Sequence, residues 1–199
     1  MRFLTSPHLP ALLACLSLAL FSSPPSAEED SWTLQQLMHQ FRQAGERSNR
    51  FTETRQLALL DQPIEQSGTL TFVPPDHLIR ELSPPSDSRY EIKGKRLTIS
   101  HGDGKQQTLL LDNLPHLLAF TASLRSVLAG DLATLQTYFT TRFSGNGTHW
   151  LLALIPKQPQ LAGQVARIEI AGRHRNIDRY TVFETGGDQI ITRLIPVRD

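Results

Sequence analysis

The chain has 199 residues, of which 39% are hydrophobic and 7% aromatic, enough for one domain with a substantial core. Its 20 basic and 19 acidic residues give a net charge of +1, and no face or tail is strongly basic, which argues against a nucleic-acid-binding protein. We therefore expect one folded domain of ordinary composition with no nucleic-acid partner.

The N-terminus has the features of a secretory signal peptide. Arg2 supplies a positive charge, an apolar run follows from Leu9 to Phe21, and small residues end at Ala27 before an acidic segment. The apolar run is shorter than the ~20 residues that a membrane-spanning helix needs. We therefore predict a signal peptide over residues 1–27 and a mature domain over residues 28–199.

Cys15 is the only cysteine, and it lies within this segment. Cleavage after Ala27 would leave a mature chain without thiol chemistry, disulfides or cysteine metal ligands. An alternative stays open, because residues 12–15 (LLAC) resemble a lipobox, which would make Cys15 a lipidated N-terminus. A lipobox normally ends the apolar run, whereas this run continues to Phe21, so cleavage is the favoured interpretation.

An amphipathic helix is predicted next. Thr33 and Gln36 have the spacing of a capping box, and Gly45 marks the end of the pattern. Four apolar residues recur at helical spacing and form one stripe: Leu34, Leu37, Met38 and Phe41.

The hydrophobic period then changes to two, which predicts strands. Six are expected before the next helical segment, over residues 51–60, 68–73, 77–83, 90–92, 96–100 and 107–111. A helical insert follows over residues 114–139, divided at Gly130, with Asp131 as the N-cap of its second part. Five further strands are expected over residues 141–144, 149–156, 165–171, 177–184 and 189–196.

Successive hairpins predict an antiparallel meander, and a sheet of this many strands tends to curl. The helices must bury their apolar stripes, and the concave face of a curled sheet is the place available. Residues 150–155 (WLLALI) are apolar on both faces. This pattern fits a covered central strand or a strand with one face on an apolar cavity. The leucine-rich insert likewise fits core packing or a lid over that cavity.

No motif points to catalysis or metal binding. The seven histidines form no ligand pattern such as H-E-x-x-H, and the chain has no G-x-S-x-G turn and no phosphate-binding loop. We therefore expect a protein that is not an enzyme, with no metal site and no cofactor.

The order and spacing of the segments resemble the LolA family of outer-membrane lipoprotein carriers. The shared features are the N-terminal helix, a first strand beginning FTETR at Phe51, the segment GTLTF at residues 68–72, a break at Pro75-Asp76, the Gly94 hairpin and the helical insert before Trp150. The resemblance implies a mainly β fold: a half-open antiparallel barrel of about eleven strands, closed by the N-terminal helix and the insert.

The resemblance also implies a function in the periplasm. Family members bind the acyl chains of lipoproteins, collect them from an inner-membrane transporter and pass them to an outer-membrane acceptor. We expect a monomer with such partners. This chain departs from the family at Pro74, where an arginine thought to latch the helical lid is usual. A divergent branch is indicated, with a cargo of lipoproteins or of a glycolipid, polyene or other lipid.

Strand alternation gives candidate site residues. The residues predicted to line a lipid cavity are Phe51, Leu57, Leu78, Leu82, Trp150, Leu152 and Leu154. Glu53, Arg55 and Arg80 alternate with some of them, and we predict that Glu53 pairs with an arginine and that the group holds the lid or contacts an anionic headgroup. Ordinary surface ion pairs are the alternative, because a one-residue slip in register reverses the faces.

Three other functions stay open from the sequence. One is an outer-membrane-anchored lipoprotein acceptor of the same fold, which requires lipidation of Cys15. Another is a lipid-modifying enzyme such as an acyl hydrolase, which would need a nucleophile beside a base. The last is a lipid-sensing regulatory module.

Overall fold

The computed structural model describes residues 32–197, except for the side chains of residues 115, 116, 119 and 120. The predicted signal peptide, residues 1–27 with Cys15, lies outside the described residues, so its cleavage and its lipidation stay predictions.

Eleven strands and four α-helices form the described part of the chain. The strands are β1 (Arg47–Gln56), β2 (Ile64–Val73), β3 (His77–Leu82), β4 (Ser88–Lys93), β5 (Arg96–His101), β6 (Gln106–Leu110), β7 (Phe139–Gly145), β8 (Trp150–Pro156), β9 (Val165–Arg173), β10 (Asn176–Glu184) and β11 (Gln189–Pro196). The helices are α1 (Leu34–Arg42), α2 (Pro115–Ala129), α3 (Leu132–Tyr138) and α4 (Pro159–Ala162), with a short 3-10 turn, η1 (Leu111–Asn113).

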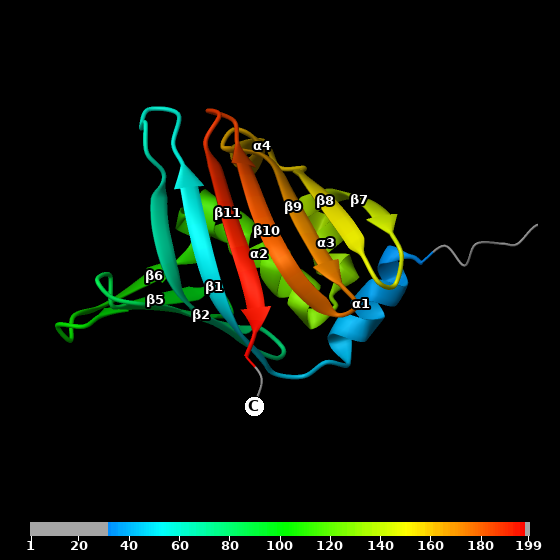
Figure 1. Ribbon diagram of the computed structural model, residues 1–199, viewed down its shortest axis with the longest axis horizontal. Helices are drawn as coiled ribbons and strands as arrows, with labels where there is room; N and C mark the ends of the chain where they lie inside the picture. The colour runs from blue at the N-terminus through cyan, green and yellow to red at the C-terminus, as the bar shows by residue number, and fades with distance from the viewer. Residues whose placement is uncertain (1–31, 198–199) are drawn as a thin grey trace, which may run out of the picture. The chain divides into compact units, whose positions relative to one another are not determined.

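All the strands belong to one antiparallel sheet in the order β6-β5-β4-β3-β2-β1-β11-β10-β9-β8-β7. The first and last strands meet in its middle, where Phe51 lies opposite Leu194. The sheet curves around α1, α2 and α3, which lie on one of its faces, and it does not close, because β6 and β7 do not pair with each other (Figure 1). The predicted half-open barrel of about eleven strands is confirmed.

The helix ends form where the sequence predicts them. Thr33 Oγ1 accepts a hydrogen bond of 3.2 Å from Gln36 N, and Gln36 Oε1 accepts one of 2.7 Å from Thr33 N, which completes the capping box of α1. Asp131 caps α3 by accepting a bond of 3.0 Å from Thr134 N. Gly130 ends α2 with a left-handed φ of 66°, a conformation that glycine adopts without strain.

Some predicted boundaries were wrong. The first strand was expected over residues 51–60, but β1 begins at Arg47 and ends at Gln56. Residues 57–60 keep an apolar composition yet lie in the β1–β2 loop, where Leu59 is 98% exposed. A bond of 2.7 Å from Ala58 N to Asp188 Oδ1 holds this loop against the β10–β11 turn. The short elements α4 and η1 were not predicted.

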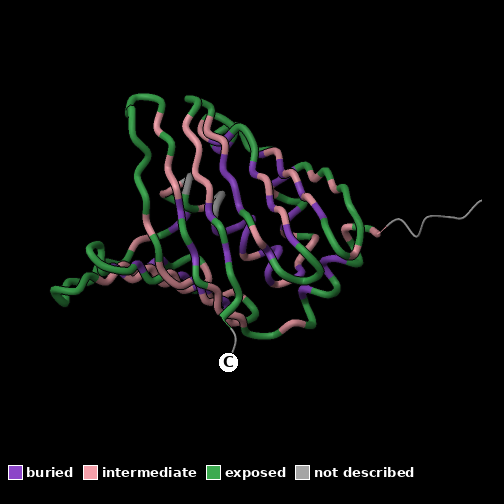
Figure 2. Tube along the Cα trace, in the orientation of Figure 1, coloured by how far each residue is buried: buried purple, intermediate pink, exposed green. Residues whose placement is uncertain are grey.

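The concave face of the sheet has two regions: one is packed with helices, and the other surrounds an open space. In the packed region, α1, α2 and α3 pack against one another or against the apolar residues of β8, and an edge-to-face contact of 5.9 Å joins the rings of Phe41 and Trp150. In the cavity region, β3, β4 and β5 and the ends of β1, β10 and β11 surround an open space. Buried segments gather around the helices, whereas the β5–β6 hairpin and the loops are exposed (Figure 2).

Candidate ligand cavity

The cavity region encloses a space of about 460 Å³ on the concave side of the sheet. Its apolar wall is formed by Leu78, Leu82, Tyr90, Ile92 and Leu97 from β3 to β5, by Val165, Ile168, Val182 and Ile190 from β9 to β11, and by Leu117 from α2. Its polar residues are Glu53, Arg55, Gln66, Arg80 and Glu184. Pockets of roughly 300–1,000 Å³ with a mostly apolar lining and a few polar groups are typical of small-molecule sites.

A charged cluster, Glu53 with Arg55 and Arg80, lies in the wall of this cavity. Glu53 Oε1 accepts a bond of 2.9 Å from Arg55 Nε, and Glu53 Oε2 lies 3.0 Å from a terminal nitrogen of Arg80. Thr192 Oγ1 donates a third bond of 3.1 Å to the carboxylate. The Glu53 side chain is 1% exposed, so its charge is stabilised by these donors in place of water.

The surroundings of Glu53 act on its pKa in opposite directions. Burial alone would raise the pKa, because it penalises the charged carboxylate. The charge and hydrogen bond of Arg80, together with those of Arg55, outweigh burial and hold the pKa of Glu53 below its usual value. The carboxylate is therefore ionised at neutral pH, and the cluster contains one negative and two positive charges.

Several of the predicted site residues come together here. Leu78 and Leu82 line the cavity, as do Glu53, Arg55 and Arg80. Glu53 and Arg55 of β1 and Arg80 of β3 thus face the same concave space, and Glu53 pairs with both arginines.

The other predicted lining residues lie elsewhere. Trp150, Leu152 and Leu154 are buried in the packed region and do not line the cavity, because α1 and its neighbours fill the concave side of β8. Leu57 lies past the end of β1, in the β1–β2 loop. Phe51 is buried, and the Arg80 guanidinium lies over it, 4.5 Å from the centre of the Phe51 ring. None of these five residues is part of the lining of this cavity.

The helices are held to the sheet by arginines that the sequence analysis did not identify. Arg125 of α2 donates a bond of 2.6 Å to the Gly94 carbonyl in the β4–β5 turn. Arg47 of β1 donates to the carbonyls of Phe41 and Leu128, at 2.6 and 3.1 Å, and burial with the nearby Arg175 charge lowers the pKa of Arg47 to about 10. Backbone carbonyls are present at every residue, so such acceptors leave no sequence signal.

A side-chain pair also joins α2 to the sheet. Ser123 Oγ and Tyr180 OH share a buried hydrogen bond of 2.7 Å, and burial raises the pKa of Tyr180. In the described part of the chain, the Glu53 cluster makes no hydrogen bond to a helix. A role of the cluster in holding the lid and a role in contacting a ligand both stay predictions.

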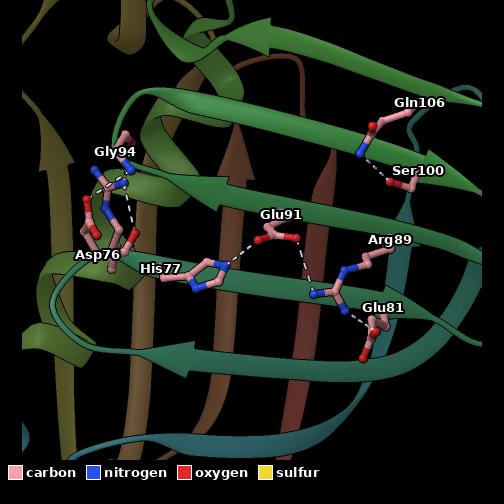
Figure 3. A network of polar contacts seen from close by, with 9 residues as sticks. Asp76, His77, Glu81, Arg89, Glu91, Gly94, Ser100 and Gln106 are labelled. Carbon is pink, nitrogen blue, oxygen red and sulfur yellow. Dashed lines mark hydrogen bonds and ion pairs between the residues drawn. The ribbon is translucent and has the colours of Figure 1, made fainter.

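The convex face of the same strands is polar. His77 Nε2 lies 2.8 Å from Glu91 Oε1, and Arg89 lies between Glu91 and Glu81 in one network (Figure 3). Because side chains alternate along a strand, Leu78, Leu82, Tyr90 and Ile92 point to the cavity side, whereas Ile79 lies on the convex face. Within residues 32–197, no helix is long and apolar enough to cross a membrane.

An unclosed antiparallel sheet, curved around helices and an apolar cavity, is the architecture of the LolA-like class. The chain belongs to that family: the model of the family described as outer membrane lipoprotein carrier protein LolA-like matches residues 22–194. The resemblance predicted from the sequence is therefore confirmed.

Two solved structures have a similar fold at low sequence identity. An outer membrane lipoprotein-sorting protein domain from Vibrio parahaemolyticus has 8% identity and a TM-score of 0.50, over 82% of this chain and 90% of that one. A LolA superfamily protein from Nitrosomonas europaea has 9% identity and a TM-score of 0.47, over 85% and 95% of the two chains. Such low identities show the fold alone. No curated protein sequence matches the chain.

Proposed function

We propose that the protein is a periplasmic carrier that binds the acyl chains of lipoproteins or related lipids in its cavity. The carrier shields those chains from water and moves them towards the outer membrane. The observation that supports this proposal is the space of about 460 Å³ with its apolar wall, since burial of a hydrocarbon chain is favourable by roughly 25 cal/mol per Å² of apolar surface.

The partners follow from the same proposal. The carrier works as a monomer, takes its cargo from an inner-membrane transporter and passes it to an outer-membrane acceptor. It performs no chemistry on the lipid and needs no metal or cofactor. An anchored acceptor of the same fold would differ in carrying lipid on Cys15, so the mass and the cell fraction of the mature protein separate the two functions.

The test uses lipid that co-purifies with protein isolated from a periplasmic extract. Ile92→Trp places a large ring in the cavity wall, and Ile79→Trp places the same ring on the convex face of neighbouring β3. Native mass spectrometry is expected to detect bound lipid in the wild type and in Ile79→Trp, and to detect little in Ile92→Trp.

Both variants need a melting temperature close to that of the wild type for this comparison. Bound lipid that persists in a folded Ile92→Trp protein would contradict the cavity as the cargo site. Wild-type protein that carries no lipid and binds no added lipid would contradict the carrier function itself.

A further inference from the structure

The charges in the cavity wall are unequally distributed. Two guanidinium groups contact one carboxylate in the Glu53 cluster, which leaves a local excess of one positive charge in an apolar space. Glu184, the other acidic residue of the wall, lies on β10, two strands away from Arg55 on β1. Neighbouring strands are ~4.8 Å apart, so Glu184 and the cluster are separated by roughly 10 Å across the sheet.

The arginines of the cluster have donors left over. Arg55 uses its Nε atom for Glu53, and no described residue accepts a hydrogen bond from its two terminal nitrogens. The Arg55 side chain is 40% exposed, against 16% for Arg80, which is held between Glu53 and the ring of Phe51. Arg55 is therefore the accessible member of the cluster, and Arg80 is the fixed one.

A guanidinium with free terminal nitrogens matches the oxygen atoms of a carboxylate or a phosphate. Charge-assisted hydrogen bonds of this kind are stronger in a low-dielectric cavity than in water. The apolar wall beside the cluster, which includes Leu78 and Leu82, accommodates a hydrocarbon chain at the same time. A space of about 460 Å³ is of the size that holds one small amphiphile.

From these observations we infer that the cavity selects an amphiphile with an anionic head, a carboxylate or a phosphate, which binds to Arg55 beside Arg80 while its chain lies along the apolar wall. This inference rests on the proposed lipid-binding function and adds the class of head group. The cluster thus acts as a binding site for the ligand, and Glu53 keeps the two arginines in place.

The experiment measures displacement of the neutral fluorescent probe N-phenylnaphthylamine by three ligands with the same alkyl chain: dodecanoate, dodecyl phosphate and dodecanol. The wild type is expected to bind at least one of the two anions about tenfold more tightly than the alcohol, as one charge-assisted contact allows. The better of the two anions identifies a fatty-acid-type or a phosphate-type head.

Three variants test the assignment of that preference. Arg55→Met is expected to remove most of it without weakening dodecanol, and Arg80 still pairs with Glu53 in this variant. Glu184→Gln removes a negative charge from the wall and is expected to tighten anion binding. Arg142→Met, on the exposed part of β7, is the control and is expected to behave as the wild type.

Equal binding of the anions and the alcohol by the wild type would overturn the inference and leave the carrier function standing. A preference that survives in Arg55→Met would overturn it as well. If the probe and all three ligands fail to bind, the proposed function fails and this inference fails with it.

Discussion

In both the packed region and the cavity region, the strands place apolar residues on the concave face of the sheet, but only the packed region is filled. Leu152 of β8 is completely buried under the helices, whereas Leu82 of β3 faces an open space. The difference lies in what packs against each strand. Phe41 of α1 contacts Trp150 of β8, whereas Leu117 of α2 is the one described helix residue that lines the cavity. Stability and ligand binding are therefore expected to depend on different residues of one continuous sheet.

The largest expected effect comes from comparing two leucine-to-alanine substitutions, one in each region. Leu152→Ala creates a void among close-packed side chains and should lower the free energy of unfolding by about 2–5 kcal/mol. Leu82→Ala enlarges an existing space, so it loses only part of the transfer free energy, about 1 kcal/mol. Urea denaturation measures both, and equal losses would contradict the division into two regions.

The buried carboxylate gives the next effect, since it links stability to the cavity wall. Glu53→Gln leaves two arginines without their counter-charge in a partly buried site, and we expect a loss of about 2–4 kcal/mol in the free energy of unfolding. Glu81→Gln, on the convex face, removes an exposed ion-pair partner of Arg89 and should change stability by less than about 1 kcal/mol. If the Glu53→Gln protein is as stable as the Glu81→Gln protein, the ion pairs of Glu53 with Arg55 and Arg80 do not stabilise the fold.

The pH dependence of stability follows from the same group. The pKa of Glu53 in the folded protein lies below its usual value of 4.5. Its stabilising contribution is therefore fully present above about pH 4.5, and it is lost as the pH falls from there through the folded value. Melting temperatures measured down to acid pH should fall less steeply for Glu53→Gln than for the wild type. Parallel curves would contradict this assignment.

Gly130 tests how closely α1 and α2 approach in the packed region. A Cβ at this position would lie 2.2 Å from the Met38 carbonyl oxygen, and φ is 66°. Gly130→Ala should therefore destabilise by about 2 kcal/mol or more, from backbone strain and a clash together. Gly45 has a similar φ of 68° but nothing within 4 Å of such a Cβ, so Gly45→Ala reports the strain alone, about 1 kcal/mol. Equal thermal destabilisation would exclude the close approach.

The smallest effect concerns the bond between α2 and β10. Tyr180→Phe removes the hydroxyl that meets Ser123 and should cost about 1 kcal/mol in the free energy of unfolding. If this bond also keeps α2 against the sheet, exchange of amide hydrogens along α2 should become faster in the variant. If amide exchange along α2 is unchanged in the variant, this hydrogen bond contributes to global stability but does not hold α2 against the sheet.

The sequence predicted the order of the elements because each element has a local signal. The capping box of Thr33 and Gln36, the N-cap at Asp131 and the hairpin at Gly94 are all decided by residues close in the chain. Strand alternation placed Glu53 and Arg80 among the candidate cavity residues, but their contact depends on the register of β1, β2 and β3.

The sequence alone could not distinguish residues that line the cavity from residues buried in the packed region. Leu152 and Leu154 of β8 and Leu78 and Leu82 of β3 are all apolar residues on the concave face, and the sequence does not show which of them a helix covers. Residues 57–60 were misassigned for a similar reason, because an apolar composition does not show where a strand leaves the sheet. A side chain that binds a backbone carbonyl, such as that of Arg125, leaves no recognisable pattern in the sequence, because every residue has a carbonyl.

The most direct test of the central claim is a crystal structure of the protein bound to a fatty acid with a bromine atom at the end of its chain. The anomalous signal of bromine locates the hydrocarbon without reference to any mutation. We predict one bromine site inside the cavity, next to the apolar wall formed by Leu78, Ile92 and Leu97. Bromine located on the convex face or between α1 and β8, with the cavity empty, would contradict it.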